Sequence, residues 1–223
     1  ITAAGVTQVT GGFEAAQPGA GSRALALGYA AGITSQSDSA VAVGNSAGNN
    51  TQGTSAVAVG KASGETSQGA NATAVGREAG KTSQGDNAVA VGYIAGQTNQ
   101  GDYGVAVGRA AGLDNQGDNS VAIGRSAAQI TQGAASTAVG YAAGQTSQGA
   151  SAVAVGSSAG QTNQGNASVS MGWNAGSDNQ QGYSVAIGVE SGLTTQGTQS
   201  VAMGYQAGKT TQGVNAVGVG TLA

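Results

Sequence analysis

Two rows of residues in this chain have the types and the spacing that chemistry would need. The first is acidic: Asp86, Asp102 and Asp118 occupy the same place in three successive repeats of the chain, and three carboxylates brought side by side could gather a cation. The Gly/Asp calcium-binding nonapeptide of other β-rolls is absent, however, and Ala or Thr often replaces Asp in the other repeats. Because Asp before Asn, Tyr or Ser also suits a turn, we expect turn formation here and predict neither a metal site nor a cofactor.

The second row is basic and aromatic, and its members likewise share one place in the repeat. Arg109 and Arg125 would lie one repeat apart, and like charges that close are tolerated only in solvent, so this row should face outward. Guanidinium groups pair with acidic groups and aromatic rings stack on sugars, which makes the row a candidate glycan-binding surface; ordinary surface decoration is the other interpretation. The candidate surface-binding column consists of Tyr29, Arg77, Tyr93, Arg109, Arg125, Tyr141, Trp173 and Tyr205.

The composition argues against an enzyme. The chain of 223 residues has no histidine and no cysteine, and no carboxylate pair recurs in a fixed frame, so acid–base and nucleophilic catalysis have no candidate residues. The net charge is −3 and the seven basic residues are scattered, which argues against nucleic acid as a partner. There is no run of 18 apolar residues, so we predict no membrane insertion.

A 16-residue repeat, without a single insertion, positions both rows. Thirteen short apolar runs each end at a glycine, which we number position 0 of the repeat. Such strict register is typical of a coil whose turns stack, because one extra residue would displace every side chain that follows. These glycines are Gly28, Gly44, Gly60, Gly76, Gly92, Gly108, Gly124, Gly140, Gly156, Gly172, Gly188, Gly204 and Gly220.

The residues before each of these glycines predict a short strand. Position −3 is Val in ten repeats, position −2 is Ala in eleven, and position −1 is always branched or long and apolar. This alternation indicates that the two large residues share one face of the strand and the Ala takes the other. We expect the large residues to fill the inside of the coil and the Ala to point outward.

The second half of the repeat predicts another short strand and glycine corners. Position 4 is Gly in every complete repeat except that of Ala128, and position 9 is usually Gly. Position 8 is Gln in all twelve complete repeats, and stacked amides can form a hydrogen-bonded ladder that fixes the register. The predicted structural Gln ladder consists of Gln36, Gln52, Gln68, Gln84, Gln100, Gln116, Gln132, Gln148, Gln164, Gln180, Gln196 and Gln212.

Together these positions predict an all-β fold, a parallel β-solenoid or β-roll with one 16-residue repeat per turn and about 13 turns. Residues 24–223 form the solenoid, and residues 1–23 are an atypical N-terminal capping or connecting segment. A column of Ala followed by other small residues permits close approach of a flat partner, and the economical partner is a second copy of the chain. We therefore expect a homotrimer with the Ala column at the subunit contact.

The repeat units also resemble known families. SVAIGRSAA beginning at Ser120, SVAIGVESG at Ser184 and AVAVGYIAG at Ala88 resemble the head repeats of YadA-like trimeric autotransporter adhesins. They are at least as similar to the repeats of phage and giant-virus fibre proteins, which continue into turns rich in Asn, Thr, Gln and Gly. The resemblance covers residues 24–223 and implies a left-handed parallel β-roll that is trimeric in the adhesins. The adhesin-head repeat is typically shorter than the repeat of this chain, which favours the viral fibre.

The function predicted from these features is structural. We expect a stiff segment of a viral tail fibre or surface adhesin, extracellular or on the virion surface, that supports attachment to a host or surface. Its partners would be two further copies of itself and a host-surface glycan or protein. The alternative is a monomeric solenoid with a flat Thr/Gln binding face, for ice or for a glycan.

Overall fold

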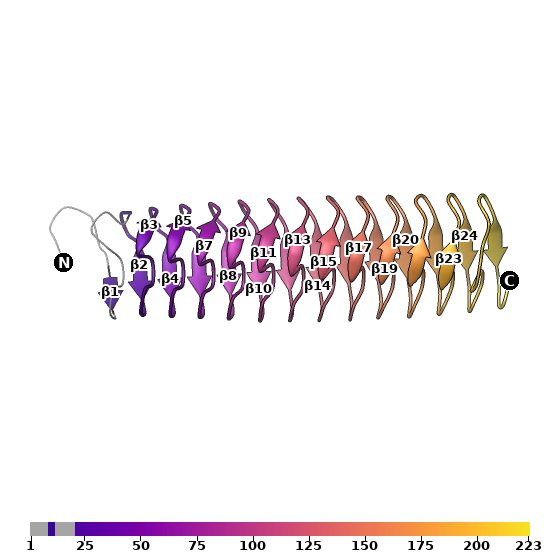
Figure 1. The fold of residues 1–223 in the computed structure, drawn as a ribbon, viewed down its shortest axis with the longest axis horizontal. Helices are drawn as coiled ribbons and strands as arrows, with labels where there is room; N and C mark the ends of the chain where they lie inside the picture. The colour runs from indigo at the N-terminus through magenta and orange to yellow at the C-terminus, as the bar shows by residue number, and fades with distance from the viewer. Residues whose placement is uncertain (1–8, 12–20) are drawn as a thin grey trace. The chain divides into compact units, whose positions relative to one another are not determined.

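The computed structural model describes residues 9–11 and 21–223. The chain is an all-β parallel β-solenoid of about 12 turns with a 16-residue repeat, as the sequence predicts (Figure 1). The prediction of about 13 turns counts the glycines of position 0. The last of these, Gly220, is followed by only three residues, so it does not add a complete turn. The solenoid divides into two units, Ile1–Ala110 and Ala111–Ala223, which are described separately below.

The first unit contains two parallel sheets. We call the sheet built from positions −3 to −1 the valine sheet and the sheet built from positions 6 to 8 the glutamine sheet. The valine sheet contains β1 (Val9–Gly11), β2 (Leu25–Leu27), β4 (Val41–Val43), β6 (Val57–Val59), β8 (Thr73–Val75), β10 (Val89–Val91) and β12 (Val105–Val107), in that spatial order. The glutamine sheet contains β3 (Thr34–Gln36), β5 (Asn50–Gln52), β7 (Thr66–Gln68), β9 (Thr82–Gln84) and β11 (Thr98–Gln100).

The second unit repeats this arrangement. Its valine sheet contains β14 (Val121–Ile123), β16 (Thr137–Val139), β18 (Val153–Val155), β20 (Val169–Met171), β22 (Val185–Ile187), β24 (Val201–Met203) and β25 (Val217–Val219). Its glutamine sheet contains β13 (Asp114–Gln116), β15 (Ile130–Gln132), β17 (Thr146–Gln148), β19 (Thr162–Gln164), β21 (Asp178–Gln180) and β23 (Thr194–Gln196).

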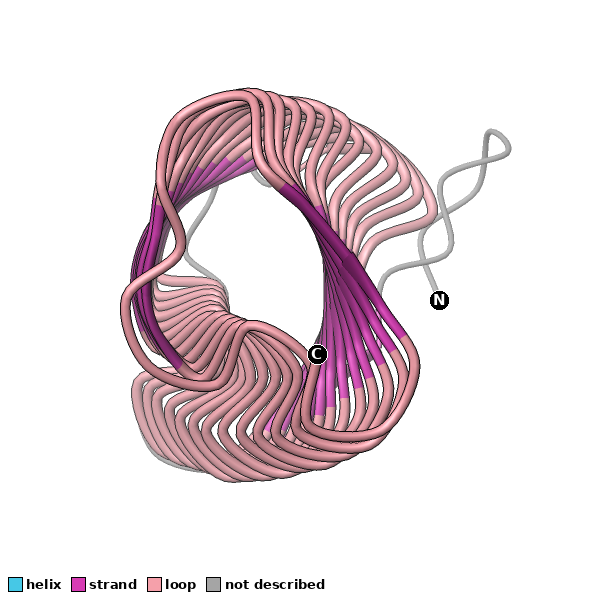
Figure 2. Ribbon diagram, turned by 90° about the vertical axis from the view of Figure 1, so that its right-hand side faces the viewer, coloured by secondary structure: helices cyan, strands magenta, loops and turns pink. Residues whose placement is uncertain are grey.

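Each strand pairs with its equivalent in the neighbouring turn. Val89 on β10 is in register with Val105 on β12, and Gln84 on β9 with Gln100 on β11. The hydrogen bonds between turns continue through the corners, where for example the Gly44 N–H donates to the Leu27 carbonyl at 2.8 Å. Viewed along the coil, the two strands of a turn lie on opposite sides and the loops join them (Figure 2).

The prediction that the large apolar residues fill the inside of the coil is wrong. In most strands of the valine sheet whose burial is described, the central residue is a buried Ala, as Ala90 and Ala154 are, while the flanking residues are half-buried or exposed on the outer face. The alternation was therefore correct and the assignment of its two faces was reversed. The Ala column faces the inside of its own coil, so it cannot form the predicted subunit contact.

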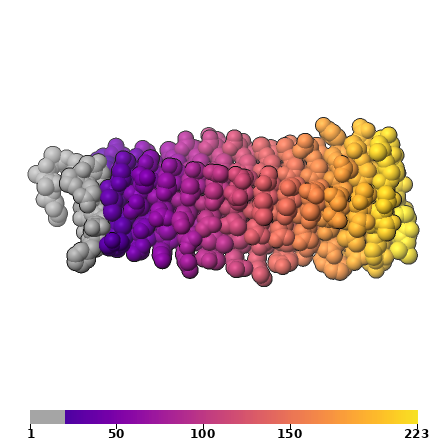
Figure 3. Space-filling model, in the orientation of Figure 1, coloured from indigo at the N-terminus to yellow at the C-terminus, as the bar shows by residue number. Residues whose placement is uncertain are grey.

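The size of the turn explains the reversal. Two three-residue strands close around an interior that holds Ala at position −2, Ala or Ser at position 3 and one Gln from position 8. Ala26, Ala31, Ala42, Ala47 and Ala58 form one buried cluster of this kind. The largest fully buried side chains are glutamines, and a pair of Val side chains in every turn would overfill so narrow a space. The turns of each unit lie against one another on the face seen in Figure 3, and the described residues enclose no pocket.

The glycine at position 0 is required by backbone geometry and by space. Gly188 has a φ of +123°, and a Cβ built on it would lie 2.5 Å from the carbonyl oxygen of Gly204 in the next turn. The sequence did not indicate that positions 2, 7 and 11 also adopt positive φ without glycine. Glu78, Ser83 and Asn87, with φ of 57°, 55° and 58°, show all three within one turn.

The predicted capping segment, residues 1–23, lies mostly outside the described residues. Within it, Val9–Gly11 pairs in parallel with Leu25–Leu27, with Val9 opposite Leu25. The 16-residue offset of the repeat therefore already holds between β1 and β2.

Candidate functional surface

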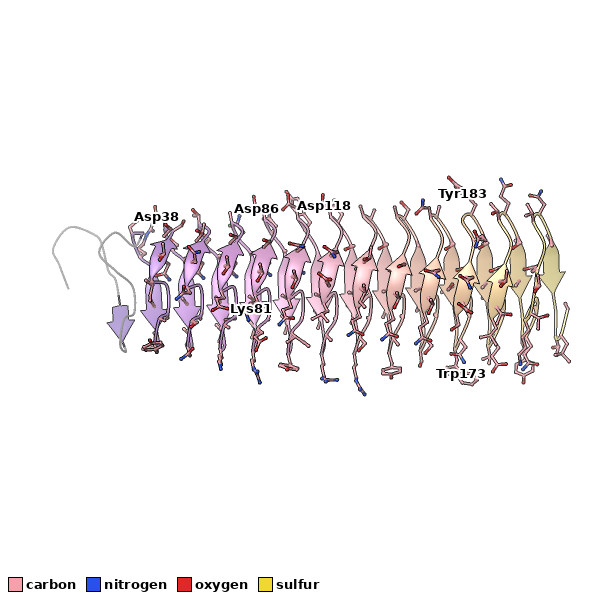
Figure 4. All side chains as sticks on the ribbon, in the orientation of Figure 1. Asp38, Lys81, Asp86, Asp118, Trp173 and Tyr183 are labelled. Carbon is pink, nitrogen blue, oxygen red and sulfur yellow. The ribbon has the colours of Figure 1, made fainter. Side chains whose placement is uncertain are left out.

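The candidate surface-binding column occupies position 1, directly after the valine sheet, and all eight of its residues are exposed. Tyr29, Trp173 and Tyr205 each expose about half of their surface, between 51% and 53%. In the second unit Trp173 lies at one edge of the turn, whereas Asp118 and Tyr183 lie at the opposite edge (Figure 4). The structure thus places the column on an outer edge. Its role in binding remains a prediction.

Arginine and tyrosine side chains in this column stack on one another. The Arg77 guanidinium lies 5.4 Å and that of Arg109 5.9 Å from the centre of the Tyr93 ring. In the second unit the Arg125 guanidinium lies 5.5 Å from the centre of the Tyr141 ring. Cation–π contacts of this kind hold the guanidinium groups in place while leaving them in solvent.

Carboxylates next to this column are paired. Glu78 accepts from the Nε of Arg77 at 3.1 Å and from the Gln97 amide at 2.8 Å, and Lys81 lies 4.0 Å away. In the second unit, the Lys209 ammonium at 2.7 Å and the Gln206 amide at 2.7 Å hold the pKa of Glu190 below its ordinary value. No cluster of three or more potential metal ligands occurs among the residues described.

The acidic row stabilises the turns. The Asp86 carboxylate accepts a hydrogen bond from the Ala70 N–H at 2.7 Å, and the Asp102 carboxylate accepts one from the Asp86 N–H at 2.8 Å. Asp38 accepts from the Ser22 N–H in the same way. The carboxylates of Asp38, Asp86 and Asp102 therefore each satisfy a backbone donor of the preceding turn, which is a structural role between turns.

The glutamines of position 8 lie inside the coil, and all twelve are buried. Each side chain crosses from the glutamine sheet to the valine sheet: the Gln68 Nε2 donates to the Val57 carbonyl at 2.9 Å and to the Oε1 of Gln84 at 3.1 Å. In the first unit this amide ladder runs unbroken from Gln36 to Gln100. Along this run the glutamines thus join the two sheets of each turn and also join each turn to the next.

The ladder of the second unit is modified at Ser170, where Ser replaces the Ala of position −2. Gln164 donates to the Ser170 hydroxyl, and that hydroxyl donates to the Oε1 of Gln180 at 2.5 Å. The hydroxyl therefore relays the hydrogen bond that the two amides make directly elsewhere.

Ala128 departs from the ladder's geometry in another way. It adopts a φ of +44° at a position where the other repeats have Gly, and the Oε1 of Gln132, four residues later, has no hydrogen-bond partner. At the equivalent Gly144, an added Cβ would lie 2.8 Å from the Cδ of Gln148. The Ala128 Cβ occupies the corresponding place and therefore crowds the Gln132 side chain.

Replacing Ala128 with glycine should therefore stabilise the second unit. Removing the crowding and the left-handed alanine should raise the free energy of unfolding by about 1 kcal/mol, which exceeds the entropic cost of the added glycine. Chemical denaturation followed by circular dichroism measures the change. The reverse substitution, Gly144→Ala, should lower stability, and a stabilising effect of that variant would contradict the explanation.

The predicted flat Thr/Gln face does not exist as such, because its glutamines are inside the coil. Position 7 does present exposed Ser, Thr or Asn, as at Ser147, but Asp114, Ile130 and Asp178 interrupt the Thr row at position 6. An ice-binding or glycan-binding flat face would therefore have only the Thr, Ser and Asn side chains of positions 6 and 7, without the glutamines.

The valine sheet provides an outer surface that the sequence analysis missed. Positions −3 and −1 form two parallel columns that are apolar except at Thr73 and Thr137, and neither column contains a charged residue. Leu27, Ile123 and Met203 expose between 40% and 48% of their surface. The alternation in sequence contained this signal, but alternation alone does not say which face of a strand is inside.

No helix among the described residues is long and apolar enough to span a membrane. In comparisons with known proteins, no family model and no curated protein matches the chain.

Proposed function

We propose that the chain is a structural, non-enzymatic segment of a viral tail fibre or surface adhesin, and that three copies associate through their valine sheets. The observation that carries the proposal is the uncharged, half-exposed outer face of the valine sheet. Parallel sheets are almost always covered on both faces, and here the chain itself covers only the inner one. A contiguous apolar face of this kind marks an interaction surface.

A copy of the same chain is the partner that fits this face best. The two apolar columns recur in every turn at the spacing of the strands, so equal faces match each other over their whole length. The three-fold arrangement is supported by the resemblance of the SVAIG units to trimeric β-rolls. It leaves position 1 and the glutamine sheet on the outside of the assembly.

The proposed role follows from this arrangement. The many hydrogen bonds between turns, together with the buried amide ladder, resist local opening and proteolysis. A trimer presents each outer row three times, and repeated weak contacts then act together as one strong attachment. The place of action is the outside of a cell or the surface of a virion.

The molecular mass in solution tests the proposal, and we expect about three chains of 21.0 kDa by light scattering. The double variant Val153→Lys/Val155→Lys should shift the mass to one chain, because it places charges on the valine sheet without entering the core. Gln145→Lys/Gln161→Lys is the matched control, because it adds the same two charges at position 5, where other turns have Lys81 and Lys209.

The wild-type mass decides the outcome. A single-chain mass would overturn self-association, and a two-chain mass would overturn the three-fold arrangement. If the double lysine variant still has the mass of three chains, the valine sheet is not the contact between the copies. Circular dichroism of each variant checks that the solenoid remains folded.

A further inference from the structure

The first unit concentrates positive charge in a single row. Position 1 carries Lys61, Arg77, Tyr93 and Arg109 on four consecutive turns, all of them exposed, and we call these four residues the basic ladder. No carboxylate occupies position 1 anywhere in the chain, although the net charge is −3. Three of the seven basic residues, which are far apart along the sequence, are thus brought into one row by the fold.

The two arginines of the basic ladder are held in place before any ligand arrives. Both guanidinium groups stack against Tyr93, at 5.4 Å and 5.9 Å from the ring centre, from the turn on either side. Two turns separate the arginines, so their charges are spaced by about 10 Å along the ladder. Guanidinium groups that are already oriented lose less side-chain freedom on binding than free ones.

One neighbouring carboxylate, that of Glu78, neutralises the basic ladder only in part. Glu78 contacts only the Nε of Arg77, and it is shared with Lys81 and the Gln97 amide. The Arg77 side chain remains 58% exposed, which leaves its terminal amino groups accessible for a bidentate contact.

We infer that the basic ladder binds a linear acidic polysaccharide that runs along the solenoid and carries carboxylate or sulfate groups. Such a polymer repeats its charges along one line, as the ladder does, and pairs them with guanidinium groups. Single-stranded nucleic acid fits less well, because guanidinium groups approach the Tyr93 ring from both neighbouring turns, where bases would have to stack. This inference rests on the attachment role proposed above, but not on the trimeric state.

The test is a titration of the intact chain with a size-defined polyuronate oligosaccharide, with a neutral dextran oligosaccharide for comparison. We expect the polyuronate alone to bind, and Arg77→Gln/Arg109→Gln to weaken binding at least about tenfold. The matched control, Arg23→Gln/Lys209→Gln, removes the same charge away from the ladder and should change the affinity less than about twofold.

The variant Tyr93→Leu tests whether the orientation of the arginines, and not only their charge, contributes to the affinity for polyuronate. It keeps every cation but removes the ring that orients the two arginines, and we expect about threefold weaker binding. Equal losses in the ladder variant and its control would overturn the inference, and so would unchanged binding in the ladder variant. Equally tight binding of a single-stranded oligonucleotide would assign the ladder to nucleic acid instead.

The mass of every sample is measured alongside the titration. Polyuronate binding by a single chain would preserve the ladder inference and overturn the trimer, whereas a trimer that binds no polyuronate would overturn the ladder alone.

Discussion

Replacing Gly188 with alanine is expected to lower the free energy of unfolding by about 4 kcal/mol. The new Cβ would lie 2.5 Å from the carbonyl oxygen of Gly204, and the φ of +123° at Gly188 is one that alanine rarely adopts. The clash is with backbone that is itself fixed, because the Gly204 N–H donates to the Ile187 carbonyl at 2.8 Å. Relief would require the two turns to separate and break such hydrogen bonds.

Gly220→Ala is the matched control for this prediction. Gly220 has nearly the same φ, +126°, but nothing lies within 4 Å of a Cβ built on it. We expect Gly220→Ala to lower the free energy of unfolding only by the cost of placing alanine at a positive φ, about 1–2 kcal/mol. Guanidinium denaturation followed by circular dichroism compares the two variants. Equal losses would show that conformational strain, and not the contact between turns, makes glycine necessary at position 0.

The sequence was sufficient to predict the architecture of the solenoid. Glycines at an unbroken spacing of 16 fixed the length of the turn, and the Val-Ala-Val alternation fixed the strands of the valine sheet. A glutamine at the same position of every complete repeat indicated the ladder. These features are local, and each turn repeats them, so many independent positions specify the same register.

What lies inside the coil could not be predicted in the same way. Alternation separates two faces of a strand but does not say which is enclosed, and the usual preference for large apolar cores pointed to Val. The outcome depends on the width of the interior, which follows from how tightly positions 0, 2 and 4 turn the chain. The stacking of Arg77 and Arg109 on Tyr93 depends on side-chain direction at a corner, which the sequence pattern does not contain.

Replacing Gln148 with alanine should lower the free energy of unfolding by about 3–4 kcal/mol. Gln148 donates to the Thr137 carbonyl at 2.9 Å and to the Oε1 of Gln164 at 3.1 Å, and it accepts from Gln132 at 3.1 Å. Alanine would leave these buried groups without their partner and would open a void between the two sheets. A buried polar group left unpaired costs about 1–3 kcal/mol, so the loss of several at once dominates the effect.

The same turn contains a matched control for Gln148→Ala. Gln145 also takes part in an amide ladder, donating to Gln129 at 2.9 Å and accepting from Gln161 at 2.9 Å, but its ladder lies on the outside of the coil and is only partly buried. Gln145→Ala should cost less than about 1 kcal/mol, because water replaces the lost partners. Gln148→Met fills most of the volume without the hydrogen bonds, so a loss close to that of alanine would identify the amide contacts as the stabilising part. Equal effects at Gln145 and Gln148 in chemical denaturation would instead show that amide stacking, inside or outside, stabilises the coil irrespective of burial.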